Sequence, residues 1–202
     1  MPNIVYFFDK VFWPQREGCH NPPANHLQYL VGSGLEFTVV LLVQPHEEEL
    51  VLPFLKHFSD LDIRTIRVSE MNEPLVSLYV NLKKKHTFHS MLEANRVAIV
   101  DPRLQEELAR ADIFFTNYVY TAPFLEHLPK HCVSIVETHD LQSSQQTCLL
   151  RGWSPRSGNV GTPECQALYK SLLAEELALL NLFDFVIAIA GCMSSDEMGI
   201  LR

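Results

Sequence analysis

Uninterrupted apolar runs of strand length set the strongest limit on what this chain can fold into. The clearest is Val39 to Val43, which lacks the polar alternation of a strand that faces water on one side. Continuous apolar character is typical of strands covered on both faces, as in parallel sheets. The β-branched or aromatic runs that we expect to form strands are residues 3–8, 37–43, 63–68, 112–116, 132–137 and 185–190.

Helical patterns lie between these runs. Asn21-Pro22 supplies a capping residue and a proline at the first helical position, and Thr162-Pro163 opens a helix that we expect to run to about Phe183. The alternation predicts βαβ units and therefore an α/β fold, a doubly wound and mostly parallel Rossmann-like sheet with helices on both faces. The length of 202 residues favours one domain over residues 1–202.

Two segments are harder to assign. Residues 74–96 carry apolar side chains at helical spacing, and we interpret them as one helix with Lys83, Lys84 and Lys85 on its exposed side. Residues 141–161 are rich in Ser, Gln, Gly and Pro, which predicts a loop able to act as a lid.

Composition excludes several classes of protein. The net charge of -8 opposes general attraction to nucleic acid or to an anionic membrane. Asp9 and Lys10 interrupt the first apolar run too early for a signal peptide, and no run of about 18 apolar residues occurs. The five cysteines form no Cys-x-x-Cys pair, so we expect reduced thiols in a cytoplasmic protein. Histidine pairs lack a third ligand, and we predict no metal and no cofactor.

The run from Ile135 leads through Glu137 into His139-Asp140 without a turn residue. In an open α/β sheet, residues just past the carboxyl end of a strand line the ligand crevice. The pair is therefore a candidate catalytic site. A histidine that hydrogen-bonds a loop, followed by an aspartate that starts a helix, explains the same residues equally well.

Glu176 stands out on a helical wheel drawn at about 100° per residue. It falls in the middle of an apolar stripe that contains Leu172 and Leu180, whereas Glu175 lies toward the polar side. A carboxylate in such a stripe is costly unless it is hydrogen-bonded. We predict that Glu176 is buried and accepts a hydrogen bond from the loop after the fifth or sixth strand. A structural role and a role in the site remain equally compatible with the pattern.

Three segments and two glutamates together resemble a known family: Ala111 to Asn117, Ile135 to Asp140, Asp184 to Ile189, Glu176 and Glu197. In order and spacing they are similar to the amino-terminal domain of a group 1, retaining glycosyltransferase of the GT-B fold. The resemblance implies two Rossmann-like domains, of which this chain covers the first, the acceptor side. Because the family binds the nucleotide sugar mainly on the second domain, the resemblance also implies no transfer by this chain alone.

The resemblance assigns roles to particular residues. It implies that His139 lies near the reacting sugar and that Asp140 orients the loop or the imidazole. The implied substrate contacts, which form the wall of the crevice, are Gly18, His20, Asn117, Ser194 and Glu197. The first loop departs from the family because it contains a single glycine beside an acidic residue, which weakens contact with donor phosphate.

The implied partners are a sugar or glycan acceptor, a nucleotide sugar held jointly with a second domain, and a membrane surface touched peripherally. A different hypothesis is a non-catalytic Rossmann-like subunit that binds a ligand or docks on a separate donor-binding chain. A nicotinamide-dependent oxidoreductase is a weaker interpretation, because no Gly-x-Gly-x-x-Gly follows the first strand.

Overall fold

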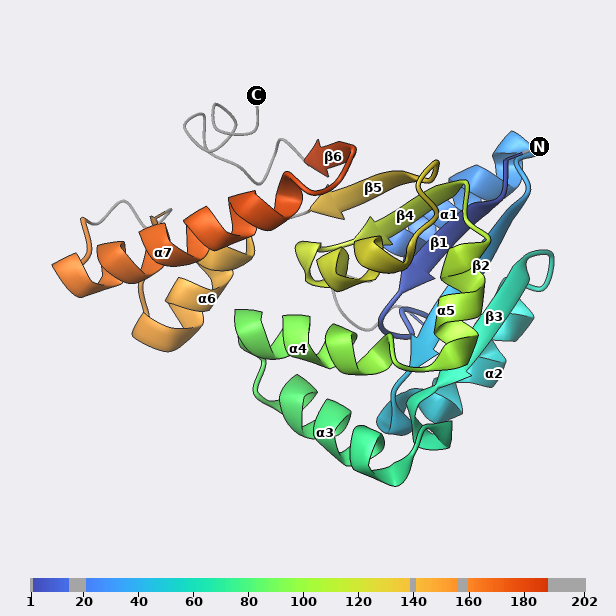
Figure 1. Ribbon diagram of the computed structural model, residues 1–202, viewed down its shortest axis with the longest axis horizontal. Helices are drawn as coiled ribbons and strands as arrows, with labels where there is room; N and C mark the ends of the chain where they lie inside the picture. Colours follow the sequence, from blue (N-terminus) through green and yellow to red (C-terminus); the bar gives the residue numbers. More distant parts are fainter. Residues whose placement is uncertain (1, 15–20, 139–140, 156–159, 189–202) are drawn as a thin grey trace.

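Six strands form one parallel sheet in the order β3-β2-β1-β4-β5-β6 (Figure 1). The computed structural model describes residues 2–14, 21–138, 141–155 and 160–188. The strands are β1 (Ile4–Phe8), β2 (Phe37–Val43), β3 (Asp62–Arg67), β4 (Ile113–Asn117), β5 (Val133–Thr138) and β6 (Phe185–Ala188). All neighbouring strands pair in parallel. The strand order reverses between β1 and β4, so their carboxyl ends form the switch point of a doubly wound fold.

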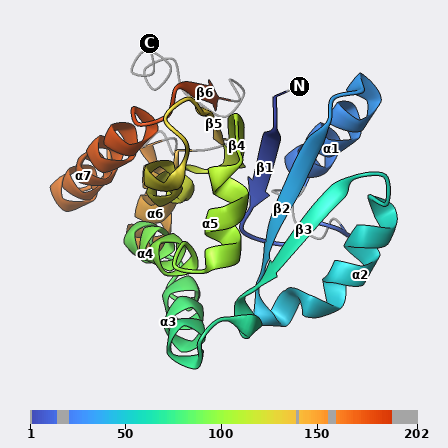
Figure 2. The same ribbon diagram turned by 45° about the vertical axis from the view of Figure 1, so that its right-hand side comes forward.

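Helices cover both faces of the sheet (Figure 2). On one face, α1 (Asn21–Ser33) and α2 (Glu48–His57) pack against strand residues such as Tyr6 and Val39. On the other face, strand residues such as Phe7 and Val40 pack against the elements α3 (Glu73–Lys84), α4 (Phe88–Ala98), α5 (Pro102–Ala109) and the 3-10 segment η4 (Val119–His127). Alternate residues of each strand thus enter different layers of the core, which explains the uninterrupted apolar runs.

A third apolar cluster lies at the β5 side of the sheet. It joins α7 (Pro163–Leu180) with α4, η4 and Val136 of β5. Thr162 caps α7, because its side-chain oxygen accepts a hydrogen bond from the Cys165 N–H, as the sequence predicts. The predicted fold class is confirmed, and each of the six predicted runs overlaps one of the six strands, although β3, β4 and β5 each extend one residue beyond their predicted run.

The prediction of one helix across residues 74–96 is wrong, because α3 ends at Lys84 and α4 begins at Phe88. His86 has a φ of 50°, a left-handed conformation that ends a helix. Thr87 then caps α4 by accepting a hydrogen bond from the Ser90 N–H. Lys83 is also not on an exposed side: it is 6% exposed, and its Nζ donates to Asp9 at 2.6 Å. Lys84 and Lys85 are exposed as predicted.

The prediction of a loop over residues 141–161 is wrong for its first half, which forms α6 (Gln142–Arg151). Most polar side chains of α6 are buried, namely Gln142, Ser143, Ser144, Gln146 and Thr147, whereas Gln145 and Arg151 are exposed. Gln146 shows why, because its amide accepts from the Phe88 N–H and donates to the His86 carbonyl. The partners are polar groups far away in the sequence, so the helix lacks the apolar periodicity by which a buried helix is usually recognised.

No helix in the described part of the chain is long and apolar enough to cross a membrane. Within those same residues, no three His, Cys, Asp or Glu side chains form a group that could hold a metal ion.

Candidate functional site

Four polar side chains meet at the switch point of the sheet. Asn117 ends β4, and its register partner on β5 is Glu137, so the two side chains lie next to each other on one face. The Asn117 amide donates to Glu137 Oε2 at 3.1 Å. Tyr6 of β1 places its hydroxyl 3.3 Å from Asn117 Oδ1. His26, in the second turn of α1, places Nδ1 3.1 Å from Glu137 Oε2 and 3.3 Å from the Tyr6 hydroxyl.

The residues of this polar cluster differ in solvent exposure. Glu137 is 1% exposed, and Asn117 and Tyr6 are also buried. The side chain of His26 is 40% exposed. Because a buried carboxylate needs hydrogen-bond donors, Asn117 and His26 together make the position of Glu137 tolerable. The cluster therefore has one solvent-exposed imidazole, that of His26, which the buried Glu137 carboxylate holds in position.

The charges of the cluster influence one another. The hydrogen bond with Glu137 and its negative charge raise the pKa of His26, against the opposing effect of partial burial. Burial, with a smaller contribution from Glu137, raises the pKa of Tyr6 well above its usual value, so the phenol stays protonated. When the neutral His26 ring donates its Nδ1 proton to Glu137, Nε2 carries the lone pair. That nitrogen can then accept a proton from a hydroxyl group.

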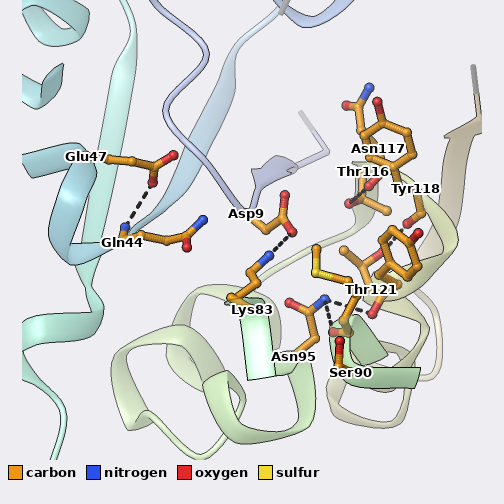
Figure 3. A network of polar contacts seen from close by, with 12 residues as sticks. Asp9, Gln44, Glu47, Lys83, Ser90, Asn95, Thr116, Asn117, Tyr118 and Thr121 are labelled. Carbon is orange, nitrogen blue, oxygen red and sulfur yellow. Dashed lines mark hydrogen bonds and ion pairs between the residues drawn. The ribbon is translucent and has the colours of Figure 1, made fainter. Parts of the chain in front are cut away.

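A second polar cluster follows β1 and β2 at the same edge (Figure 3). Lys83 and Asp9 form a largely enclosed ion pair. Burial alone would raise the pKa of Asp9, but the charge and hydrogen bond of Lys83 outweigh it and hold the pKa below its usual range. Glu47 lies nearby in η2 (Pro45–Glu47) and accepts from the N–H groups of Val11 and Gln44. Burial raises the pKa of Glu47 to about 7.

Glu176 fixes the start of α6. Its two carboxylate oxygens accept from the N–H groups of Gln142 at 2.7 Å and Ser143 at 2.8 Å, and its exposed fraction is 0%. The prediction of a buried Glu176 that is hydrogen-bonded by the segment after the fifth strand is confirmed. Because the carboxylate occupies the amino terminus of α6, it satisfies N–H groups that have no partner inside the helix. Glu175 is exposed, also as predicted, and its carboxylate pairs with His89.

The structure places Asn117 at the carboxyl end of β4, but the side chain is buried against Tyr6 and Glu137. Asn117 therefore positions Tyr6 and Glu137 from within the core and is not itself exposed. The other predicted site residues lie outside the described part of the chain: Gly18, His20, His139, Asp140, Ser194 and Glu197.

Sequence reasoning missed Tyr6, His26 and Glu137 as site residues. A carboxylate inside an apolar strand was the one local signal, since Glu137 follows Ile135 and Val136. Tyr6 and His26 give no such signal, because an aromatic residue in a strand and a histidine on a helix are ordinary. Only the parallel register of β1, β4 and β5 brings them together.

A surface hollow of about 550 Å³ lies elsewhere, at the opposite edge, where β1, β2 and β3 begin. Residues such as Asn3, Phe37 and Asp62 line it. We assign the candidate site to the carboxyl edge, because open parallel sheets bind ligands outside the carboxyl ends of their strands. The pair of the half-exposed His26 and the buried Glu137 also lies at that edge.

The sequence matches no family model and no curated protein. Among solved structures, the chain is similar to the crystal structure of UGT89C1 from Arabidopsis thaliana, with a TM-score of 0.44 and 12% sequence identity. The similarity covers 96% of this chain and 51% of that chain, so this chain spans about half the length of its neighbour. So distant a likeness carries no argument about activity, and the fold class rests on the sheet order of the chain itself.

Proposed function

We propose that this chain is the acceptor-side domain of a glycosyltransferase, in which the acceptor hydroxyl binds at His26. The observation that carries the proposal is the His26–Glu137 pair at the switch point, with a buried carboxylate and a half-exposed imidazole. The sequence segments that resemble the glycosyltransferase family include β4 and β5, the strands that supply Asn117 and Glu137.

The pair suits chemistry on a hydroxyl group. Glu137 orients the ring and stabilises the imidazolium, so His26 Nε2 can accept the hydroxyl proton. In the transfer step, the acceptor oxygen forms a bond to the anomeric carbon of the sugar, the bond from this carbon to the leaving phosphate oxygen breaks, and the hydroxyl proton passes to His26. Such a displacement inverts the anomeric configuration, in contrast to the retention that the family resemblance implies. A raised histidine pKa makes the ring a stronger base toward the hydroxyl proton.

The remaining predicted contacts belong to the same proposal. His139 would meet the donor sugar or the leaving phosphate, and Asp140 would orient it. Gly18, His20, Ser194 and Glu197 would complete the wall of the crevice. We propose that the nucleotide sugar binds only together with a second domain, as the resemblance implies, and we expect the 202-residue protein alone to catalyse no transfer.

A non-catalytic docking subunit is the second candidate. The observation in its favour is apolar exposure at β6, where Leu182, Phe185 and Ile187 are 60%, 60% and 45% exposed. A docking subunit needs this surface but makes no use of His26. The two candidates therefore differ in what a change at His26 does.

Ligand-observed NMR with methyl glycosides of glucose, galactose, mannose and N-acetylglucosamine tests the proposal. We expect the wild-type protein to bind at least one of these sugars and His26→Gln to weaken that binding about tenfold, which is about 1.4 kcal/mol. His131→Gln is the matched control, because His131 pairs with Asp112 at 2.9 Å at the opposite edge of the sheet. Equal binding by His26→Gln and wild type would overturn the assignment of His26. Absence of binding to all four sugars would overturn the acceptor function.

A further inference from the structure

Tyr118 adopts a backbone conformation that residues other than glycine rarely adopt. It directly follows Asn117, with φ 69° and ψ 142°. This region of conformational space is essentially restricted to glycine. Among the described residues that are not glycine, the other positive φ is that of His86, whose place at the end of a helix explains it. Tyr118 lies instead between the end of β4 and the start of η4, a position that does not require a positive φ.

Hydrogen bonds hold Tyr118 in this conformation from both sides. Its N–H donates to the Glu137 carbonyl at 2.9 Å, which continues the pairing of β4 with β5. Its carbonyl accepts from the Thr121 hydroxyl at 3.0 Å. Tyr118 is therefore fixed to Glu137, the residue whose carboxylate positions His26. The Tyr118 backbone and the His26 imidazole are thus both linked to Glu137, the first through its carbonyl and the second through its carboxylate.

Tyr118 lies next to Asn117 at the carboxyl end of β4 (Figure 3), and its side chain packs against the third apolar cluster. The residue is half-buried, unlike its buried neighbours Asn117 and Val119. The Lys10 ammonium lies 5.9 Å from the centre of the Tyr118 ring, and the Tyr120 ring lies 6.3 Å away. A lysine above an aromatic face shows that a flexible polar group can reach this face. The ring thus offers a reachable apolar surface beside polar groups.

We infer that Tyr118 is a sugar-stacking residue, whose ring packs against the C–H face of the acceptor sugar while a hydroxyl of that sugar meets His26. The inference rests on the proposed function and names a specificity-determining contact of the same site. The electron-rich face of an aromatic ring attracts the weakly positive C–H groups of a pyranose, and Lys10 can donate to a sugar hydroxyl. A strained residue beside the predicted site is expected where function requires a side chain that glycine cannot supply.

The test separates the ring from the backbone strain. Tyr118→Phe keeps the ring, Tyr118→Ala removes it and keeps the strain, and Tyr118→Gly removes both. The matched controls are His86→Ala and His86→Gly, because His86 has a positive φ far from the site in sequence. Each variant is measured for its urea denaturation midpoint and for its affinity for the methyl glycoside that the wild-type protein binds most tightly.

We expect Tyr118→Phe to bind within about twofold of wild type, and Tyr118→Ala and Tyr118→Gly to bind about tenfold more weakly, which corresponds to about 1.4 kcal/mol. We expect glycine to give a higher midpoint than alanine at both positions, because it relieves the strain. The His86 variants should bind like wild type.

Three outcomes would count against these ideas in different ways. Sugar binding by wild type with unchanged binding by Tyr118→Ala would overturn the stacking inference and leave the proposed function standing. Binding that follows the denaturation midpoint across all five variants, His86 included, would reduce Tyr118 to a structural residue and overturn the inference. Absence of sugar binding by wild type would overturn the proposed function and the inference with it.

Discussion

The carboxyl and amino edges of the sheet use carboxylates in opposite ways. At the carboxyl edge, four carboxylates are largely enclosed, namely Asp9, Glu47, Glu137 and Glu176, although Glu48 and Glu70 at the same edge are exposed. At the amino edge, where strands begin, they are at least partly exposed: Asp62, Asp112 and Asp184. Since enclosing a carboxylate costs solvation free energy, each enclosed one requires specific donors. The enclosed carboxylates at the carboxyl edge thus lower the stability of the fold unless their hydrogen-bond donors compensate for the lost solvation.

Each edge also has a histidine–carboxylate pair, and the two pairs differ in burial. In the pair at the amino edge, the side chains of His131 and Asp112 are 69% and 41% exposed. The hydrogen bond from the Asn3 N–H lowers the pKa of Asp112, and the interaction with His131 lowers it further. The Asp112 carboxylate thus links the segments before β1 and β5. Exposed pairs of this kind contribute little to stability. The His26–Glu137 pair has the same chemistry on a buried support, which is what distinguishes a site from a surface contact.

The ion pair of Lys83 and Asp9 gives the largest expected effect. Replacement of Lys83 by Met leaves the largely enclosed Asp9 without its principal partner, and we expect a loss of about 3–5 kcal/mol in the free energy of unfolding at pH 7. Lys84→Met is the control, because Lys84 is exposed, and it should change stability by about 0.5 kcal/mol or less. Urea denaturation measures both. Similar midpoints for the two variants would mean that Asp9 reaches water and that the contrast between the edges is weaker than described.

The same pair gives a pH dependence with a defined sign. Because the folded-state pKa of Asp9 is lowered, the stabilisation that it provides is present above the unfolded-state pKa and is lost as the pH falls through the folded-state pKa. Lys83→Met removes the main cause of that lowering. The difference in stability between wild type and Lys83→Met should therefore shrink as the pH falls below about 4.

Glu47 should show the opposite pH dependence. Its folded-state pKa of about 7 lies above its ordinary value of 4.5, because burial penalises the charged form. The folded state then binds more protons than the unfolded state between these values, so stability falls as the pH rises from 4.5 to 7. We expect a decrease of about 2–3 kcal/mol from this residue. Denaturation curves of Glu47→Gln should lack it, whereas those of the exposed control Glu49→Gln should retain it.

Glu176 gives a smaller effect on stability. Glu176→Ala leaves the Gln142 and Ser143 N–H groups without their acceptor, and we expect a loss of about 1–3 kcal/mol. Glu175→Ala, one position along α7 on its exposed side, should cost about 0.5 kcal/mol or less. Equal midpoints in chemical denaturation would show that the start of α6 has another source of stability.

The sequence alone predicts the sheet well, because its signal is local. The run 37–43 has the boundaries of β2, and Glu176 is recognisable because a carboxylate interrupts an apolar stripe on its own helix. Lys83 is different, since nothing within its own helix separates it from Lys84. Its burial depends on Asp9, which is far away in the sequence. Interactions between polar groups on distant segments leave no periodic pattern along either segment.

The candidate site shows the same limit. Asn117 and the end of the fifth strand follow from strand order, because carboxyl ends of parallel strands meet at one edge. The choice of Glu137 over a neighbour depends on register, which pairs it with Asn117 and not with Thr116. His26 depends further on the packing of α1. α6 escaped prediction because its buried Ser and Gln side chains resemble the composition of a loop.

The pH response of His26 is the smallest effect, and it bears most directly on the comparison of the two pairs. Because Glu137 raises the folded-state pKa of His26, the pair stabilises the protein below the unfolded-state pKa, and this stabilisation is lost as the pH rises through the folded-state value. Partial exposure of the ring limits the gain in stability, so the titration itself is the sharper measurement. Histidine NMR spectra should show His26 titrating above its ordinary value of 6.5, and Glu137→Gln should bring it back toward that value. Asp112→Asn, which changes the pair at the amino edge, should leave the titration of His26 unchanged. If Glu137→Gln also leaves it unchanged, the imidazole does not rest on Glu137, and the carboxyl edge loses the feature that sets its histidine apart.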